Sequence, residues 1–367
     1  MATTTTHVPS TTTTNSASPS CTTAVPGKYG EVPLNACNSS YNAIPDFIPA
    51  VVVATLFGVF TLVHIIEAII FKKGYAWVLI MGSAWETTAF ILHALGAHNQ
   101  QNVPFATAWQ ILFLLAPLWI NAFVYMTFAR MVHVFMPDRK VSFVKASHVS
   151  RLFVLADIFS FIVQAIGGVM VSPGVSASVQ STGLHVYEGG IGLQEVFILV
   201  FLVLMIAFHI RIRRLNQEKV LLPEEVNLNE SNEEDHTSRE NTMSCLWLLY
   251  ALYAVLAFIT MRIIYRLVEF TKGLDPSINA LPFHEYYFYS LDAFPMMVAL
   301  LILAVFHPGH FLKGPNSSLR DATREENRIK KAEKKARKQA KKEQKQQDKE
   351  ATKEQKRMEK EAKRAGP

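Results

Sequence analysis

The sequence lacks the short motifs that supply several common chemistries. It contains no GxxxxGK(S/T) phosphate-binding loop, no HExxH zinc motif and no CxxC pair, so neither nucleotide hydrolysis by this chain nor a bound cofactor is expected. Only three cysteines are present, too few for a disulfide framework. Cys21 and Cys37 could pair if their segment lies in an oxidising compartment, and two free thiols are an equal alternative. These absences give no support to an enzymatic activity.

The first 46 residues also lack the apolar core of a cleavable signal peptide. They are polar and rich in Ser and Thr, with runs at Thr3–Thr6 and Thr11–Thr14. The first apolar block must therefore itself direct translocation of this segment. Asn38 begins an Asn-Ser-Ser pattern, which is an acceptor for N-glycosylation when it is exposed outside the cell.

Long apolar blocks, by contrast, dominate the chain. Half of the 367 residues are hydrophobic, and a helix needs roughly 20 mostly apolar residues to cross a bilayer. A soluble protein would instead require amphipathic helices to outnumber the all-apolar ones, and none lies between the blocks. The sequence predicts an all-α integral membrane protein, a bundle of seven transmembrane helices near residues 47–71, 75–97, 108–132, 152–172, 191–210, 243–265 and 286–306.

Basic residues predict how these helices are oriented, because short basic loops stay in the cytosol. The odd-numbered loops carry eleven Lys and Arg, whereas the N-terminal segment and the even-numbered loops carry three. The N-terminus is therefore expected outside and the C-terminus in the cytosol. Residues 1–46 form an extracellular tail, 47–312 the membrane domain and 313–367 a cytosolic tail. Asn38 is then the expected glycosylation site, since the matching Asn229 and Asn316 lie on the cytosolic side.

The net charge of +6 belongs to the C-terminal tail. Residues 320–367 contain 19 Lys and Arg against 10 Asp and Glu, and the rest of the chain is slightly acidic, so nucleic-acid binding is not expected. The tail favours helix but has no apolar stripe to bury. It forms either a solvated charged segment or one attracted to anionic cytoplasmic lipid.

Ionisable and amide side chains inside the apolar blocks are the candidate functional residues, because such groups are costly at membrane depth. Several share a helix face: the fourth block has them three and seven residues apart, and the sixth has two arginines four residues apart. Polar stripes on several helices indicate a polar interior within apolar walls, which suits an amphipathic molecule with a charged head. The candidates for substrate binding are Glu86, Asn121, Asp157, Gln164, Gln194, Arg262, Arg266 and Asp292.

An alternative interpretation is that these groups only hold the helices together, with Asp292 pairing Arg262 and Asp157 pairing Arg130. Glu86 is the exception, because no basic partner lies obviously at its depth. His93, Glu269 and Glu285 are placed nearer the ends of their helices. The adjacent glycines Gly167 and Gly168 are expected to allow a close helix contact.

Taken in order, these residues resemble the fungal lipid-translocating exporter family, the RTA-like seven-helix proteins. The likeness covers residues 29–308. In the second helix, Glu86 is shared, but His93 stands where the family has Arg. The matching stretches are Leu115-Ala116-Pro117, Tyr125-Met126, Arg130, Asp157–Phe161, Gln164-Ala165, Gly167-Gly168, Gln194, Arg262–Arg266, Glu269-Phe270, Gly273, Glu285–Asp292, Pro295 and His307-Pro308-Gly309.

The resemblance implies export or flipping of amphipathic lipids, or resistance to them, with sphingoid long-chain bases or sterol-like amines as substrates. It also implies a plasma-membrane location, with an endomembrane as the alternative. Membrane lipids and the substrate are the expected partners. A receptor-like lipid or stress sensor is the second interpretation, although the third helix ends Phe128-Ala129-Arg130 rather than Asp/Glu-Arg-Tyr. An intramembrane zinc-dependent lipid hydrolase is the third, disfavoured because the His residues are scattered in depth.

Overall fold

The computed structural model confirms a helical membrane protein. Within the described residues, seven helical segments are long and apolar enough to span a membrane, so the chain is a multi-pass membrane protein. The structure describes residues 22–34, 36–142, 144–171, 176–221, 231–271, 278–312 and 319–364. Cys37 is disulfide-bonded and Cys245 is a free buried thiol. The sequence-based predictions for Cys21, Asn229, Asn316 and Gly273 lie outside the described residues.

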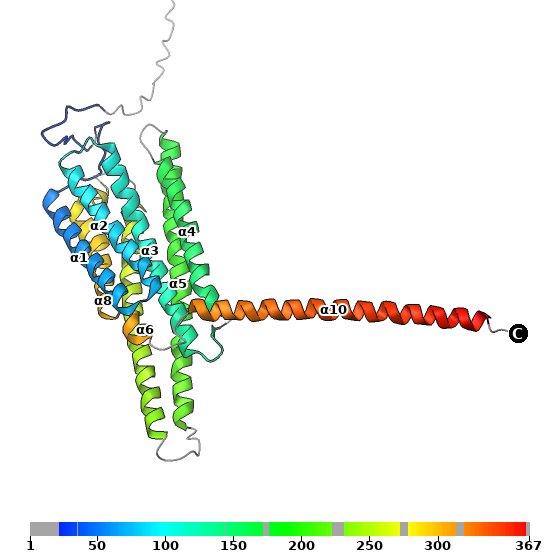
Figure 1. Ribbon diagram of the computed structural model, residues 1–367. Helices are drawn as coiled ribbons and strands as arrows, with labels where there is room; N and C mark the ends of the chain where they lie inside the picture. Colours follow the sequence, from blue (N-terminus) through cyan, green and yellow to red (C-terminus); the bar gives the residue numbers. More distant parts are fainter. Residues whose placement is uncertain are drawn as a thin grey trace, which may run out of the picture. The chain divides into compact units, whose positions relative to one another are not determined.

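The elements follow one another in chain order, and most are α-helices (Figure 1). Six spanning segments correspond to α1 (Phe47–Phe71), α2 (Trp77–Ala97), α3 (Val103–Phe135), α4 (Ala146–Met170), α5 (Ala177–Leu221) and α6 (Ser231–Thr271). The seventh, Glu285–Phe311, has α8 (Phe294–Val305) as its longest element. The shorter elements are the 3₁₀-helices η1 (Gly74–Ala76) and η2 (Leu281–Phe283), the π-helix η3 (Tyr289–Ala293), and the α-helices α7 (Glu285–Phe288) and α9 (Pro308–Phe311). The strands β1 (Lys140–Val141) and β2 (Val144–Lys145) pair in antiparallel register, and α10 (Leu319–Arg364) ends the described chain.

Two helices extend well beyond the spans predicted from hydropathy. α5 begins at Ala177, whereas the predicted span begins at residue 191, and α6 begins at Ser231, whereas the predicted span begins at residue 243. Hydropathy detects only the apolar part of a helix. Once a helix is nucleated, each polar residue added to its end gains a backbone hydrogen bond without a new nucleation cost, so the backbone continues where the apolar signal stops.

The chain divides into two compact units, and every predicted site residue lies in the first. This unit comprises Met1–Phe123, Ala156–Leu199 and Tyr253–Val305. Within it α1 packs along α2 and also contacts α8 (Figure 1). Phe57 of α1 stacks on Phe90 of α2 with ring centroids 5.5 Å apart.

The second unit comprises Val124–Leu155, Val200–Leu252 and Phe306–Pro367. Its core is aromatic: Phe201 of α5 meets Tyr125 and Phe153 edge to face or nearly so, at centroid distances of 4.6 and 5.1 Å. At its surface, Arg211 of α5 forms an ion pair of 3.0 Å with Asp138, just before the β1–β2 hairpin.

The distribution of polarity in the first unit is that of a protein in a lipid solvent. Large apolar side chains of α1 point outward, with Leu62 61% and Ile69 70% exposed. Glu86, Ser160 and Asp292 are fully buried. In water such an arrangement would be unfavourable, but in a bilayer the exposed apolar faces contact acyl chains and the polar groups face the protein interior.

Gly167 is the point of closest approach between α4 and α5. A Cβ added there would lie 2.4 Å from the backbone nitrogen of Tyr187 and 2.7 Å from the carbonyl oxygen of Gly183. A Cβ added to the neighbouring Gly168 would meet nothing within 4 Å. The predicted close contact is therefore confirmed for Gly167 and assigned to a single glycine, as in other packed membrane helices.

We expect Gly167→Ala to lower the thermal stability of the purified protein, because backbone atoms of α5 would have to move to admit the methyl group. The cost expected from overpacking is about 1–3 kcal/mol, read as a lower melting temperature in detergent. Gly168→Ala is the matched control. It should be neutral or slightly stabilising, because Ala favours helix over Gly by about 1 kcal/mol. Equal melting temperatures for the two variants would contradict the packing.

Candidate functional site

A buried cluster of ionised side chains, the arginine cluster, forms where α6 faces η3. It consists of Arg262, Arg266, Glu269 and Asp292. The nitrogens Nε of Arg262 and Arg266 pair with different carboxylate oxygens of Asp292, and Arg266 Nη1 donates to Glu269 Oε2 at 2.9 Å. The two arginines are four residues apart and so lie on one face of α6. The predicted pair between Asp292 and Arg262 is confirmed, and Arg266 joins it.

The local backbone explains how Asp292 reaches the arginines. Asp292 lies within the π-helical turn η3, three residues before Pro295. Proline has no N–H and its ring clashes with the carbonyl four residues earlier, so a regular α-helix cannot continue unchanged through Leu291. A π turn, which is frequent at functional sites, accommodates the proline and brings the Asp292 carboxylate to α6.

Phe113 of α3 supports both arginines from the other side. The guanidinium carbons of Arg262 and Arg266 lie 5.0 and 5.1 Å from its ring centroid, within the range of cation–π attraction. Arg262 Nη2 also donates to the Phe113 carbonyl oxygen at 3.3 Å. The cluster thus joins α3, α6 and η3.

Glu86 of α2 is fully buried, and neither of its carboxylate oxygens has a hydrogen-bond partner among the described residues. The arginines Arg262 and Arg266 stabilise a negative charge on Glu86, and the carboxylate of Asp292 disfavours it. No basic partner for Glu86 was obvious from the sequence. In the structure the two arginines act on Glu86 through their electric field, without a hydrogen bond to it among the described residues.

The other predicted residues form two amide-containing pairs. Gln164 of α4 donates to Gln194 of α5 at 2.9 Å, and Asn121 of α3 donates to Asp157 of α4 at 3.1 Å. A small cavity of about 30 Å³ is lined by Gln164 and Gln194 together with Arg262 and Arg266. This volume is enough for one or two water molecules.

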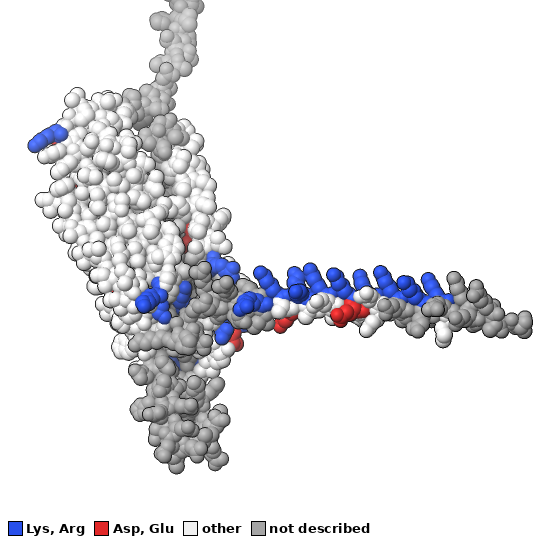
Figure 2. Space-filling model, viewed as in Figure 1, with Lys and Arg blue, Asp and Glu red and all other residues white. Residues whose placement is uncertain are grey.

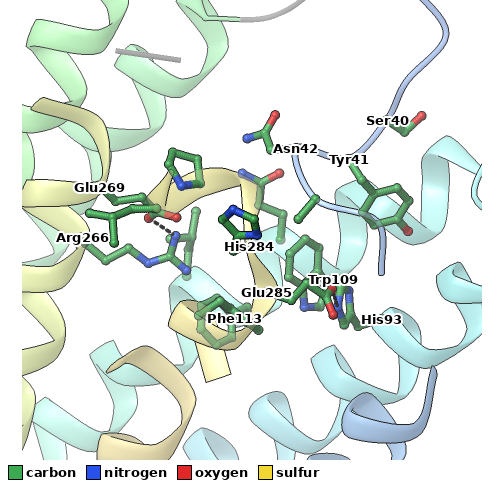
Figure 3. Close-up of a pocket in the computed structure, with 16 residues that line it drawn as sticks. Ser40, Tyr41, Asn42, His93, Trp109, Phe113, Arg266, Glu269, His284 and Glu285 are labelled. Atoms are coloured by element: carbon green, nitrogen blue, oxygen red, sulfur yellow. Dashed lines mark hydrogen bonds and ion pairs between the residues drawn. The ribbon is translucent and has the colours of Figure 1, made fainter. Parts of the chain in front are cut away.

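A larger cavity, the aromatic cavity, lies next to the arginine cluster (Figure 3). Its volume is about 140 Å³. Arg266 and Glu269 lie on one side of the view in Figure 3, and the rings of Trp109 and His93 lie on the other. The side chains that line this cavity include Tyr41, His93, Trp109, Arg266, Glu285 and Phe288.

Glu285 and His93 form a polar contact in the wall of the aromatic cavity, away from the arginine cluster. His93 Nε2 and Glu285 Oε1 are 2.8 Å apart, and the His93 ring stacks on Trp109 at a centroid distance of 4.3 Å. The backbone N–H of Asp46 donates to the other Glu285 oxygen at 3.0 Å. Burial, together with the charge of Glu285, raises the pKa of Tyr41 to about 12, so its phenol remains a neutral donor at physiological pH.

The structure distributes the eight predicted site residues unevenly. Arg266 lines both cavities, whereas Gln164, Gln194 and Arg262 line the smaller one. The remaining four, Glu86, Asn121, Asp157 and Asp292, line neither of these two cavities.

Sequence reasoning left His93, Glu285, Trp109 and Tyr41 out of the candidate site. For two of them a signal existed: His93 follows Glu86 by seven residues, and Glu285 precedes Asp292 by seven, so each pair shares a helix face two turns apart. His93 also stands where the resembling family has Arg, and it keeps a carboxylate partner. Tyr41 belongs to a segment without periodicity, which offered no signal.

Comparisons with known proteins agree with this architecture. A family model described as RTA1 like protein matches residues 79–315. A probable lipid transporter of Emericella nidulans is 38% identical over 84% of this chain and 77% of its own length. From Saccharomyces cerevisiae, protoporphyrin uptake protein 1 is 30% identical over 61% of this chain and 65% of its own length. A sphingoid long-chain base transporter of the same yeast is 26% identical over 77% of each chain. No solved structure matches.

We expect Asp292→Asn to destabilise the protein strongly, because it leaves two buried arginines facing each other without their shared carboxylate. Breaking a buried ion pair costs about 3–5 kcal/mol, which should appear as a large drop in the melting temperature of the purified protein. The matched control is Asp138→Asn, which removes the carboxylate of the half-exposed pair with Arg211 and should cost at most about 1 kcal/mol. Similar small losses for both variants would show that Asp292 does not hold the cluster.

Proposed function

Because this chain belongs to the RTA1-like family, we propose that it moves amphipathic lipids across a membrane without hydrolysing ATP within this chain. The names of its relatives support a lipid as cargo, since two are a lipid transporter and a sphingoid long-chain base transporter. The plasma membrane is the proposed location, with an endomembrane as the alternative.

The observation that carries the proposal is the aromatic cavity. Its volume of about 140 Å³ corresponds to roughly ten water-sized positions, which is enough for the polar head of a lipid and too little for its acyl chain. In the proposed complex the head enters the cavity while the chain lies against the exposed apolar faces of the spanning helices. Separate accommodation of head and chain is what an amphiphile requires.

The lining of the aromatic cavity favours a cationic head. The rings of Trp109 and Tyr41 supply aromatic surface for a cation, and Glu285 supplies a carboxylate. Phe288 already shows that this cavity accepts a cation beside a ring, since the Arg266 guanidinium carbon lies 5.9 Å from its ring centroid. Arg266 is already engaged by Glu269 and Asp292, so its charge is balanced locally. Protonated amines, such as those of sphingoid long-chain bases or sterol-like amines, are therefore the proposed substrates.

Arg266 marks a proposed path for the head group from the aromatic cavity to the smaller cavity. Arg266 and Leu114 line both the aromatic cavity and the small cavity at Gln164 and Gln194. A head that displaced the Arg266 side chain would meet those two amides next. Amides can donate to hydroxyls and accept from an ammonium group. Gln164 of α4 and Gln194 of α5 therefore form a second proposed binding site for the head group.

We expect Glu285→Gln to reduce protein-dependent movement of a labelled long-chain base between the leaflets of reconstituted vesicles. Loss of a charged hydrogen-bond partner is worth about 1.5–3 kcal/mol, so the rate should fall about ten-fold or more. The measurement is chemical quenching of the label in the outer leaflet over time.

The matched control is Glu67→Gln. Glu67 of α1 also pairs with a buried histidine, His64, at 2.9 Å, but neither residue lines the aromatic cavity. Transport should stay near the wild-type rate in this variant. Equal losses in the two variants, or full transport by Glu285→Gln, would remove the aromatic cavity as the head-group site. A ligand-dependent response of a cytosolic partner without any lipid movement would favour the sensor interpretation.

A further inference from the structure

The helix α10 carries its positive charge on one side. It runs for 46 residues, and the side chains that the structure describes along it are exposed. Figure 2 shows the Lys and Arg side chains gathered in a row along this helix, with few acidic groups among them. The transport proposed above uses none of these residues.

Helical geometry shows how far the basic residues of α10 are separated from its uncharged residues. At about 100° per residue, the lysines of one face fall within an arc of roughly 60°. This lysine face consists of Lys331, Lys338, Lys342, Lys345 and Lys349. The opposite side of the helix carries mainly small or uncharged residues, among them Ala336, Ala340, Gln344, Gln347 and Ala351, together with the charged Glu333 and Arg337.

Charge separation of this kind does not stabilise a free helix. Lysines four residues apart, such as Lys338 and Lys342 or Lys345 and Lys349, repel each other along the helix surface. A solvated single helix is instead stabilised when Glu precedes Lys by four residues, which pairs opposite charges. Glu333 and Glu343 lie away from the lysine face, so an external anion would relieve the repulsion on that face.

We propose that the lysine face of α10 lies on a membrane surface and binds the head groups of anionic phospholipids. A flat anionic surface complements a straight row of lysines, and juxtamembrane basic clusters are attracted to such surfaces. The contact is superficial, because insertion requires large apolar residues opposite the basic face. Leu319, Ile329 and Met358 are the large apolar residues in the sequence of this helix, and they are too widely spaced at about 1.5 Å per residue to form an apolar stripe.

A second copy of this chain fits the lysine face poorly. Two lysine faces would repel, and a coiled coil needs apolar residues at two positions of each heptad, where α10 has mainly Ala, Gln and charged residues. The membrane, by contrast, is always near. The last span ends at Phe311 and α10 begins at Leu319, so the connecting residues after Leu312 reach at most about 25 Å. Tethering at this range raises the effective concentration of the surface.

The test is amide hydrogen exchange of the full-length protein in two kinds of nanodisc, one of phosphatidylcholine alone and one with phosphatidylserine added. We expect exchange over residues 331–349 to slow at least about ten-fold in the anionic discs only, and the protection to disappear at high salt, because attraction to a surface is screened within a Debye length.

Two variants with equal change in net charge separate the lysine face from charge alone. In the first, Lys331, Lys338, Lys342, Lys345 and Lys349 are all replaced by Gln, and the protection should be lost. In the second, Ala336, Ala340, Gln344, Gln347 and Ala351 are all replaced by Glu, and most of the protection should remain. Because the substitutions lie outside the membrane spans, lipid transport serves as the check that both variants fold.

Three outcomes would overturn the proposal. Equal protection in neutral and anionic discs would mean that α10 is ordered without the anionic surface. Equal loss in both variants would mean that net charge, and not the lysine face, matters. Protection that appears in neutral discs only when a short RNA duplex is added, and not with phosphatidylserine, would assign the face to nucleic acid.

Discussion

The carboxylate of Asp292 is the constraint on which the interior of the first unit depends. Arginine stays protonated under all physiological conditions, so two arginines four residues apart on α6 can be buried only if a fixed negative charge lies between them. The π-helical turn before Pro295 places that charge, and both guanidinium groups then settle over Phe113. The same contacts position the guanidinium group of Arg266, which lines both cavities. Packing, charge and cavity position thus follow from one residue on η3.

The charges around Asp292 do not balance group by group. Arg262 and Arg266 both pair with Asp292, and Arg266 also pairs with Glu269. Glu86 is a further buried carboxyl group, to which no described residue offers a hydrogen bond. A buried polar group without a partner is unfavourable unless the surrounding field compensates it. Here the field is that of the two arginines, held at a distance by their pairing with Asp292. The burial of Glu86 is therefore made tolerable by the same arginine cluster, although Glu86 forms no hydrogen bond with it.

The sequence was sufficient to locate the spans and several of the polar residues that the candidate site contains, and the reasons are physical. A bilayer requires about 20 apolar residues per helix, so seven blocks could be located from hydropathy alone, and the buried polar residues stood out against them. The polar ends of α5 and α6 carry no such signal. The pair of His93 and Glu285 joins positions 192 residues apart, and nothing local in either segment specifies the other. Tyr41 enters the cavity from an irregular segment whose fold depends on contacts with helices already assembled. Long-range pairing and irregular backbone are therefore what the sequence pattern could not supply.

The two carboxylates that line the aromatic cavity in the described part of the chain, Glu269 and Glu285, differ in how strongly their partners hold them, and the proposed preference for a cationic head rests on this difference. Glu269 accepts from Arg266 through one oxygen and from the Tyr265 hydroxyl through the other, so a cationic head would have to displace a permanently charged partner. Glu285 accepts from a backbone N–H and contacts a histidine ring, both weaker competitors than a guanidinium group. The π-faces of Trp109 and Phe288 lie beside it. Of these two carboxylates, Glu285 therefore has the weaker partners, which is why the proposed binding of a cationic head is assigned to Glu285.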